Sequence, residues 1–327
     1  MLKKLLMPYI KLISNLKKVN LLSKIKILFS FLLLVILLLM ADFNALKNVF
    51  QKIDLSIFVW LIIIQFFALS LNTYKWKVFI PSLKFNQLLK FNLITFFYNM
   101  IVPGQGVGEV VKIYKMRSIL PTEEIATSVI LERVFSLFTA FIVCGFGLYF
   151  SNYQYPEILM HSTVAVILLI ILVLWVMKVS SLEFLRGSHY KVFSFKLSDK
   201  ITGLILKFSN NIRYSLTGFT VNVNVFLGVI AQLLNVSMVM LIGNSIGLDI
   251  LFVDWCWVFS CIGIALILPI SVAGIGVREG LFVMLVFQLG GKIEDGLAIS
   301  LSLLIIQLFF ALIGWLLDFR ESNLSKG

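Results

Sequence analysis

The feature that most constrains this chain is a series of apolar runs long enough to cross a lipid bilayer. A helix needs about 20 apolar residues to span the hydrocarbon core, where its backbone hydrogen bonds must be satisfied internally. Runs of this kind lie near residues 27–41, 56–73, 128–150, 158–177, 222–247 and 297–317. We therefore expect an all-α polytopic membrane protein with about six full transmembrane helices.

The composition excludes an ordinary soluble protein. Hydrophobic residues make up 60% of the 327 residues and charged residues only 13%, whereas soluble domains are about half apolar and about a quarter charged. The expected spans leave no room for a sizeable soluble domain, so residues 1–327 are predicted to form a single integral membrane domain. Three cysteines and two histidines provide neither a disulfide framework nor zinc-ligand spacing, and no metal or cofactor is expected.

The positive charge is concentrated in two blocks. Residues 1–26 carry seven lysines and no acid, and residues 178–213 carry seven basic residues against two acids. Nucleic-acid binding is one explanation of such a charge, but basic blocks beside apolar spans are what the positive-inside rule predicts. We expect a cell membrane protein, inner or plasma, with both termini and the 178–221 loop cytoplasmic, near anionic lipid headgroups. No nucleic-acid partner is expected.

The same rule places several residues near the second span. Lys75, Lys77, Lys84 and Lys90 are predicted to be cytoplasmic, with Trp76 and Tyr74 at the membrane interface.

Two apolar segments are interrupted by Pro and Gly. The run 88–102 is broken at Pro103 to Glu109, and the run 255–268 is broken at Pro269 to Glu279. Pro and Gly at membrane depth cannot continue a lipid-facing helix, so each break is expected in a re-entrant hairpin enclosed by other helices. The pattern leaves open whether 255–270 forms a half-helix or a full span.

The two interrupted segments share one order of features. Each has an apolar run, Pro, Gly-x-Gly, Glu, a short helix, an acidic pair, Ala-x-Ser and a span. The number of intervening spans predicts that the second hairpin enters from the opposite side, giving inverted repeat units of approximately 54–150 and 222–318. The acidic pairs Glu123–Glu124 and Glu294–Asp295 are interpreted as ordinary N-terminal helix acids.

Ionisable residues at membrane depth are functional candidates because burying them is costly. In the functional interpretation, the arginines bind an anionic headgroup while glutamates hold the arginines or carry a proton. In the structural alternative, the glutamates cap the half-helices and pair with the arginines. The simplest pairing across the repeats is Arg133 with Glu279 and Arg278 with Glu109. The set is Glu109, Glu132, Arg133, Arg278 and Glu279.

Amide side chains in the apolar runs either line a cavity or form interhelical hydrogen bonds. They are Gln65, Asn72, Asn92, Asn99, Gln232, Asn235 and Gln307. No catalytic constellation emerges from the sequence.

The stretch from Asn99 to Arg133, with PGQGVGE and ATSVILERVFSL, and the later SVAGIGVREG resemble the lysylphosphatidylglycerol synthase transmembrane-region family, also called the flippase-like domain. The resemblance covers essentially the whole chain and implies a role in moving or presenting lipids. The family's soluble aminoacyl-transferase domain has no counterpart, so synthase activity is not carried over. The candidate substrate-binding residues are Asn99, Pro103, Gly104, Gly106, Gly108, Glu109, Glu132, Arg133, Gly274, Gly276, Arg278 and Glu279.

The expected function is flippase-like transbilayer transport of an amphipathic lipid with an anionic or phosphate-containing headgroup. The lipid partner is a phospholipid or a polyprenyl-phosphate-linked glycan, and its headgroup passes through a polar cavity at the midplane by alternating access. The alternative is a membrane-embedded enzyme or accessory subunit acting on a polyprenyl-linked sugar or phospholipid, with Glu109 or Glu279 as the base.

Overall fold

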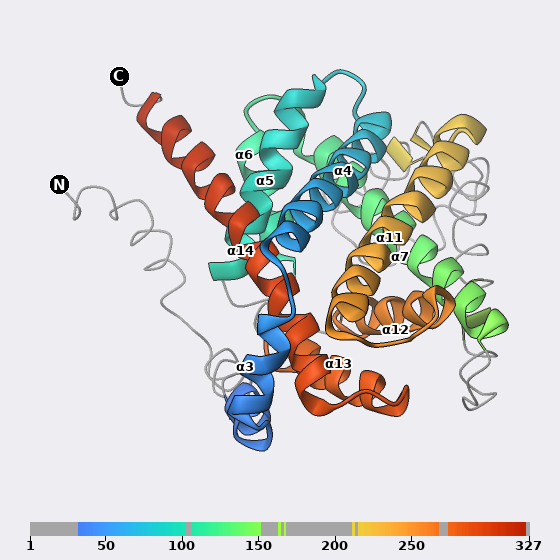
Figure 1. The fold of residues 1–327 in the computed structure, drawn as a ribbon. Helices are drawn as coiled ribbons and strands as arrows, with labels where there is room; N and C mark the ends of the chain where they lie inside the picture. The colour runs from blue at the N-terminus through green and yellow to red at the C-terminus, as the bar shows by residue number, and fades with distance from the viewer. Residues whose placement is uncertain are drawn as a thin grey trace, which may run out of the picture.

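A computed structural model describes residues 32–101, 106–151, 163–164, 167, 211–212, 215–267 and 274–324. All regular elements in these ranges are helices (Figure 1). Four are long and apolar enough to cross a membrane: α4 (Leu55–Phe79), α7 (Thr122–Phe150), α11 (Gly218–Ile246) and α14 (Ile293–Leu324). They coincide with four of the apolar runs, and the all-α membrane class is confirmed.

A sharp bend follows the first apolar run. Helix Leu32–Met40 and α3 (Phe43–Gln51) meet at an angle of 87°. Asp42 stabilises the turn because its carboxylate accepts hydrogen bonds from the N–H groups of Asn44 and Ala45 at 2.8 and 3.2 Å, capping α3. Most of the expected span at 158–177 and of the basic loop 178–221 lies outside the described residues.

The first interrupted segment forms an antiparallel pair, α5 (Phe85–Ile101) and α6 (Val107–Met116). The N–H of Gly108 donates to Asn99 Oδ1 at 2.8 Å, and Lys112 Nζ donates to Asn92 Oδ1 at 2.7 Å. Because later residues of α6 bond to earlier residues of α5, the chain reverses direction between the two helices. Gly106 at the turn has a φ of 86°, a conformation that favours glycine.

The second interrupted segment contains α12 (Phe252–Ala265) and α13 (Val277–Gln288). Because α12 ends at Ala265, its 14 residues are fewer than the about 20 that a full span needs. Gly276 precedes α13 with a φ of 83°, and its N–H donates to Glu279 Oε2 at 2.6 Å. This contact caps the first turn of α13, which then packs along α14.

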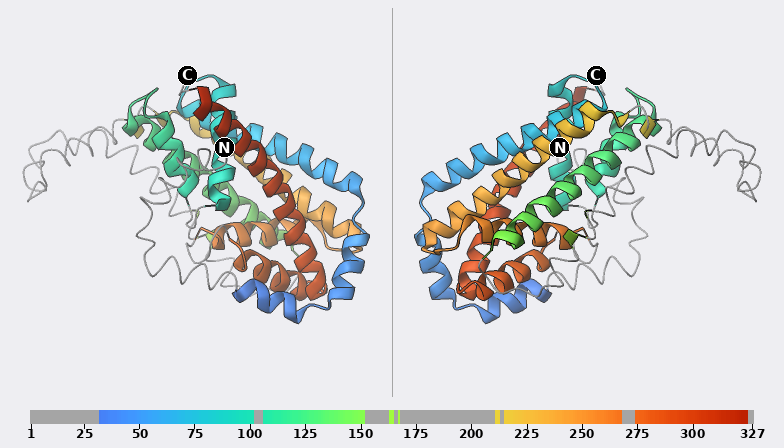
Figure 2. Two further views of the ribbon diagram at one scale, coloured as in Figure 1. Left: turned by 90° about the vertical axis from the view of Figure 1, so that its left-hand side faces the viewer. Right: turned by 90° about the vertical axis from the view of Figure 1, so that its right-hand side faces the viewer.

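The two interrupted segments start at opposite ends of the bundle (Figures 1 and 2). Near the start of α5, Lys90 forms an ion pair with Glu321 of α14 at 3.0 Å. At the other end, the Ser151 hydroxyl that follows α7 donates to Asp254 in the first turn of α12. Accordingly α5 packs against α14, α12 packs against α7, and α4 packs against α11.

Glycines permit the closest of these crossings. A Cβ atom at Gly314 of α14 would lie 2.1 Å from the backbone carbonyl oxygen of Leu93 in α5. One at Gly147 of α7 would lie 2.6 Å from the backbone nitrogen of Trp257 in α12. Backbones are therefore in contact at both crossings, an arrangement typical of membrane helix packing.

Cysteines join the core formed by the same helices. Cys144 and Cys256 are buried there, as expected for packing residues. The Sγ atoms of Cys144 and Cys261 lie 3.4 Å apart, across the contact between α7 and α12.

Gly314→Ala tests the crossing of α5 and α14. We expect this variant to lower the free energy of unfolding by about 1–3 kcal/mol, because the new methyl group overlaps a backbone carbonyl that cannot rotate away. Gly263→Ala is the matched control, since a Cβ atom there meets nothing within 4 Å. Thermal unfolding in detergent is the measurement, and equal midpoints for the two variants would contradict a backbone contact.

Candidate functional site

A polar cavity of about 260 Å³ lies among α4, α5, α6, α7 and α11. Most of its lining residues are polar or charged, and Leu69 and Phe96 are its largest apolar ones. Six of the seven amide residues proposed from the sequence line it: Gln65, Asn72, Asn92, Asn99, Gln232 and Asn235. Some of them also bond between helices, as Gln232 does by donating to Ser260 Oγ at 3.2 Å.

Lys75 extends into this cavity from α4, with only 1% of its surface exposed. Its Nζ donates to Ser136 Oγ at 3.0 Å and to Asn72 Oδ1 at 3.4 Å. The prediction that it faces the cytoplasm is therefore wrong. The helix continues to Phe79, so Lys75 lies one turn inside its end and on the same side as Asn72. Counting charge along the chain does not detect which face of a helix a residue occupies.

Lys112 is the second buried cation of the cavity, 4% exposed on α6. In addition to its bond to Asn92, its Nζ lies 3.9 Å from the centroid of the Trp76 ring, a cation–π contact. Trp76 was expected at the membrane interface, but it is fully buried and its indole N–H donates to Ser128 Oγ at 3.1 Å. Its polar atom has a partner inside the protein, so it needs no contact with the headgroup region.

Two glutamates lie at the same cavity. Glu109 Oε1 accepts from Arg133 Nη2 at 2.6 Å and Nε at 3.2 Å, whereas its Oε2 is buried without a hydrogen-bond partner among the described residues. Glu132 lines the cavity and interacts electrostatically with Lys75 and Lys112. Three basic and two acidic side chains thus lie in or beside the cavity, an excess that favours an anionic guest.

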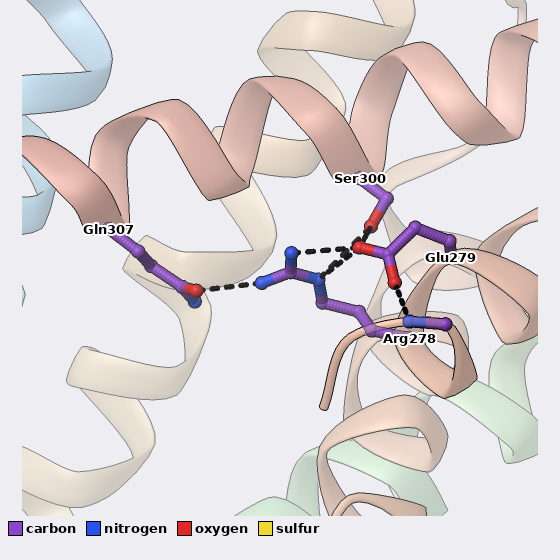
Figure 3. Close-up of polar contacts among 5 residues, drawn as sticks. Arg278, Glu279, Ser300 and Gln307 are labelled. Atoms are coloured by element: carbon purple, nitrogen blue, oxygen red, sulfur yellow. Dashed lines mark hydrogen bonds and ion pairs between the residues drawn. The ribbon is translucent and has the colours of Figure 1, made fainter. Parts of the chain in front are cut away.

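The residues of the second half form a separate cluster, shown in Figure 3. Arg278 donates to Glu279 Oε1 from Nη2 at 2.8 Å, to Gln307 Oε1 from Nη1 at 2.7 Å, and to Ser300 Oγ from Nε at 3.1 Å. Ser300 in turn donates to Glu279 Oε1 at 3.0 Å. Arg278 and Glu279 are buried in contact with α14 and do not line the cavity.

The pairing expected across the repeats is therefore wrong. Arg133 pairs with Glu109, and Arg278 pairs with Glu279, so each arginine binds a carboxylate of its own half. Both carboxylates lie in the first turn of a short helix. In the first half, the paired arginine is Arg133 of the next long helix, α7. In the second half, it is Arg278, the residue directly before Glu279.

The remaining candidate residues are glycines and a proline. Gly108 is in close contact with α5, because a Cβ atom there would lie 2.4 Å from Thr95 Cγ2, and Gly274 approaches Leu266 in the same way at 3.1 Å. Both allow close packing of an interrupted segment. Pro103 and Gly104 lie outside the described residues.

Together these features define a multi-pass membrane domain whose helices enclose a polar cavity. Within that class, the chain belongs to the family described as lysylphosphatidylglycerol synthase TM region, whose family model matches residues 24–314. No curated protein and no solved structure gives a significant match. Membership confirms the family indicated by the Pro-Gly and Glu-Arg motifs and associates the chain with lipid-related function.

The Arg278 cluster is predicted to be structural. Arg278→Gln leaves the Glu279 carboxylate buried without its cation, and deleting one partner of a buried pair costs about 3–5 kcal/mol. The double variant Arg278→Gln with Glu279→Gln removes both charges and is expected to unfold at a higher temperature than Arg278→Gln. Thermal unfolding of both singles and the double measures the coupling. Additive losses would mean that the two charges act independently.

Proposed function

We propose that this protein moves amphipathic lipids with an anionic or phosphate-containing headgroup from one leaflet to the other, with the headgroup passing through the cavity. The observation that carries the proposal is the pair of buried lysines, Lys75 and Lys112, facing one cavity lined by amides. A charged headgroup in hydrocarbon loses its hydration at a cost of several kcal/mol. Ammonium groups and amide N–H groups at the cavity wall replace that hydration.

The arrangement of the helices supports an alternating-access mechanism. We propose that units of about 54–150 and 222–318 form an inverted repeat, because the interrupted segment of α5 and α6 starts at one end of the bundle and that of α12 and α13 starts at the other. Inverted repeats with broken helices are the architecture of many transporters. In this scheme the two halves rock about their shared contacts and expose the cavity to each side in turn.

An enzymatic role is the second candidate. It is favoured by Glu109 Oε2, which is buried at the cavity and has no hydrogen-bond partner among the described residues. Such an oxygen is free to accept a proton from a bound hydroxyl group, as a general base does. Formation of a modified lipid without transbilayer movement would favour this role over transport.

Transport is tested in liposomes that contain phosphatidylglycerol with a fluorescent acyl chain. A quencher that cannot cross the membrane is added outside, so it reaches only the probe in the outer leaflet. We expect the purified protein to make the inner-leaflet probe accessible, and Lys75→Met or Lys112→Met to slow this movement at least tenfold because the anion loses a cationic partner. Lys77→Met is the matched control: it lies on the same helix and does not line the cavity. An equal effect of all three variants would contradict a role for the cavity lysines.

We further propose a cell membrane location with both termini cytoplasmic, supported by the two basic blocks. On a cysteine-free background, Ser82→Cys in the turn after α4 is expected to resist an impermeant maleimide in intact cells. Asp249→Cys, in the turn between α11 and α12, is expected to react. Both side chains are exposed in the structure, so burial does not explain a difference, and the opposite labelling pattern would overturn the orientation.

A further inference from the structure

A lipid whose headgroup occupies the cavity keeps its acyl chains in the bilayer, so the surrounding helices have to part along one seam. We propose that this seam lies between α6 and α7 and that the Glu109–Arg133 ion pair closes it. The inference rests on the proposed function, because it assigns the place where the lipid enters the cavity.

The wall at this seam is one ion pair thick. Glu109 lines the cavity, whereas the side chain of its partner Arg133 is 40% exposed. The residue before Arg133, Glu132, also lines the cavity. At this level of α7, Glu132 therefore faces the cavity, and the next residue, Arg133, is exposed and pairs with Glu109 of the cavity wall.

On its other side, α6 is held firmly. Its Gly108 and Lys112 bond to α5 at 2.8 and 2.7 Å. Lys115 forms an ion pair with the buried Asp318 of α14, which also accepts a hydrogen bond from Tyr98 of α5 at 2.9 Å. These bonds join α5, α6 and α14 into one unit, and movement of that unit relative to α7 changes the α6–α7 seam.

The seam has an apolar end and a polar end. Beside the connecting turn at 117–121, Met116 of α6 packs in one buried cluster with Ile125 and Val129 of α7. Arg133 lies 11 residues after Thr122, about 17 Å along the helix, which is roughly half the thickness of the hydrocarbon core. Apolar packing holds the connected end, so the helices separate at the end where the ion pair is.

Phosphate chemistry favours opening by an anionic lipid. Breaking the pair leaves Arg133 without its carboxylate, a change that is costly in a low-dielectric environment. An entering phosphate offers the guanidinium a new bidentate partner. A neutral headgroup offers no such replacement, so the pair selects for anionic lipids at the entrance.

Reversible cross-linking tests the seam. On a background with Cys144, Cys256 and Cys261 replaced by alanine, Val110→Cys and Ile130→Cys place thiols on α6 and α7 at exposed positions, 65% and 44% exposed, and keep the ion pair. A bifunctional methanethiosulfonate reagent then links the two helices. We expect linkage to slow phosphatidylglycerol movement at least tenfold, and a reductant to restore it. The two single-cysteine variants, treated identically, control for attachment of the reagent.

A second measurement separates the seam from transport. Native mass spectrometry follows exchange of bound phosphatidylglycerol for deuterated phosphatidylglycerol supplied in vesicles, which requires entry but no transbilayer movement. Linkage is expected to slow this exchange as well. Unchanged exchange in fully linked protein would overturn the inference, whatever the transport assay shows. Slowed exchange in a protein that moves no lipid would support the seam and reject the proposed function.

Discussion

The cost of holding two ammonium groups inside a bundle of apolar helices determines much of this architecture. Lys75 and Lys112 are each buried and each bonded to a neutral oxygen, from Ser136 and from Asn92. A buried charge is tolerated when hydrogen bonds, opposite charges or polarisable rings replace water. The amide-lined wall, Glu132 and the Trp76 ring provide this replacement, so the cavity and the lysines depend on each other.

The two halves use similar motifs for different purposes. In the first half, the carboxylate of Glu109, which follows the glycines, faces the cavity. Its partner Arg133 is partly exposed. In the second half, Glu279 caps its own helix, and Arg278 reaches Ser300 and Gln307 on α14. One interrupted segment thus carries open polar groups and the other is internally satisfied. The difference is that Arg133 belongs to the long helix α7, whereas Arg278 belongs to the short helix α13 beside Glu279.

From the sequence we predicted the all-α membrane class, the four long spans, the two interrupted apolar segments and six amides that line the cavity. These features were predictable because long apolar runs, Pro-Gly breaks and isolated polar residues are local signals. We missed Lys75 and Lys112, since a lysine near a span end is indistinguishable from an interfacial anchor by charge alone. The spacing of Gln65, Asn72 and Lys75 on one helical face was the available signal. The pairing of the arginines required distances between helices, which the order of motifs does not contain.

The packing of α5 against α14 has a consequence for biosynthesis. Tyr98 bonds to Asp318, a partner 220 residues later in the chain. During synthesis from the N-terminus, α5 and α6 therefore reach the bilayer before the helix that completes their packing exists. Until α14 arrives, their polar groups depend on lipid headgroups, water or an insertion chaperone. Of the described helices, the one latest in the chain is the one that packs against α5 and closes the first half.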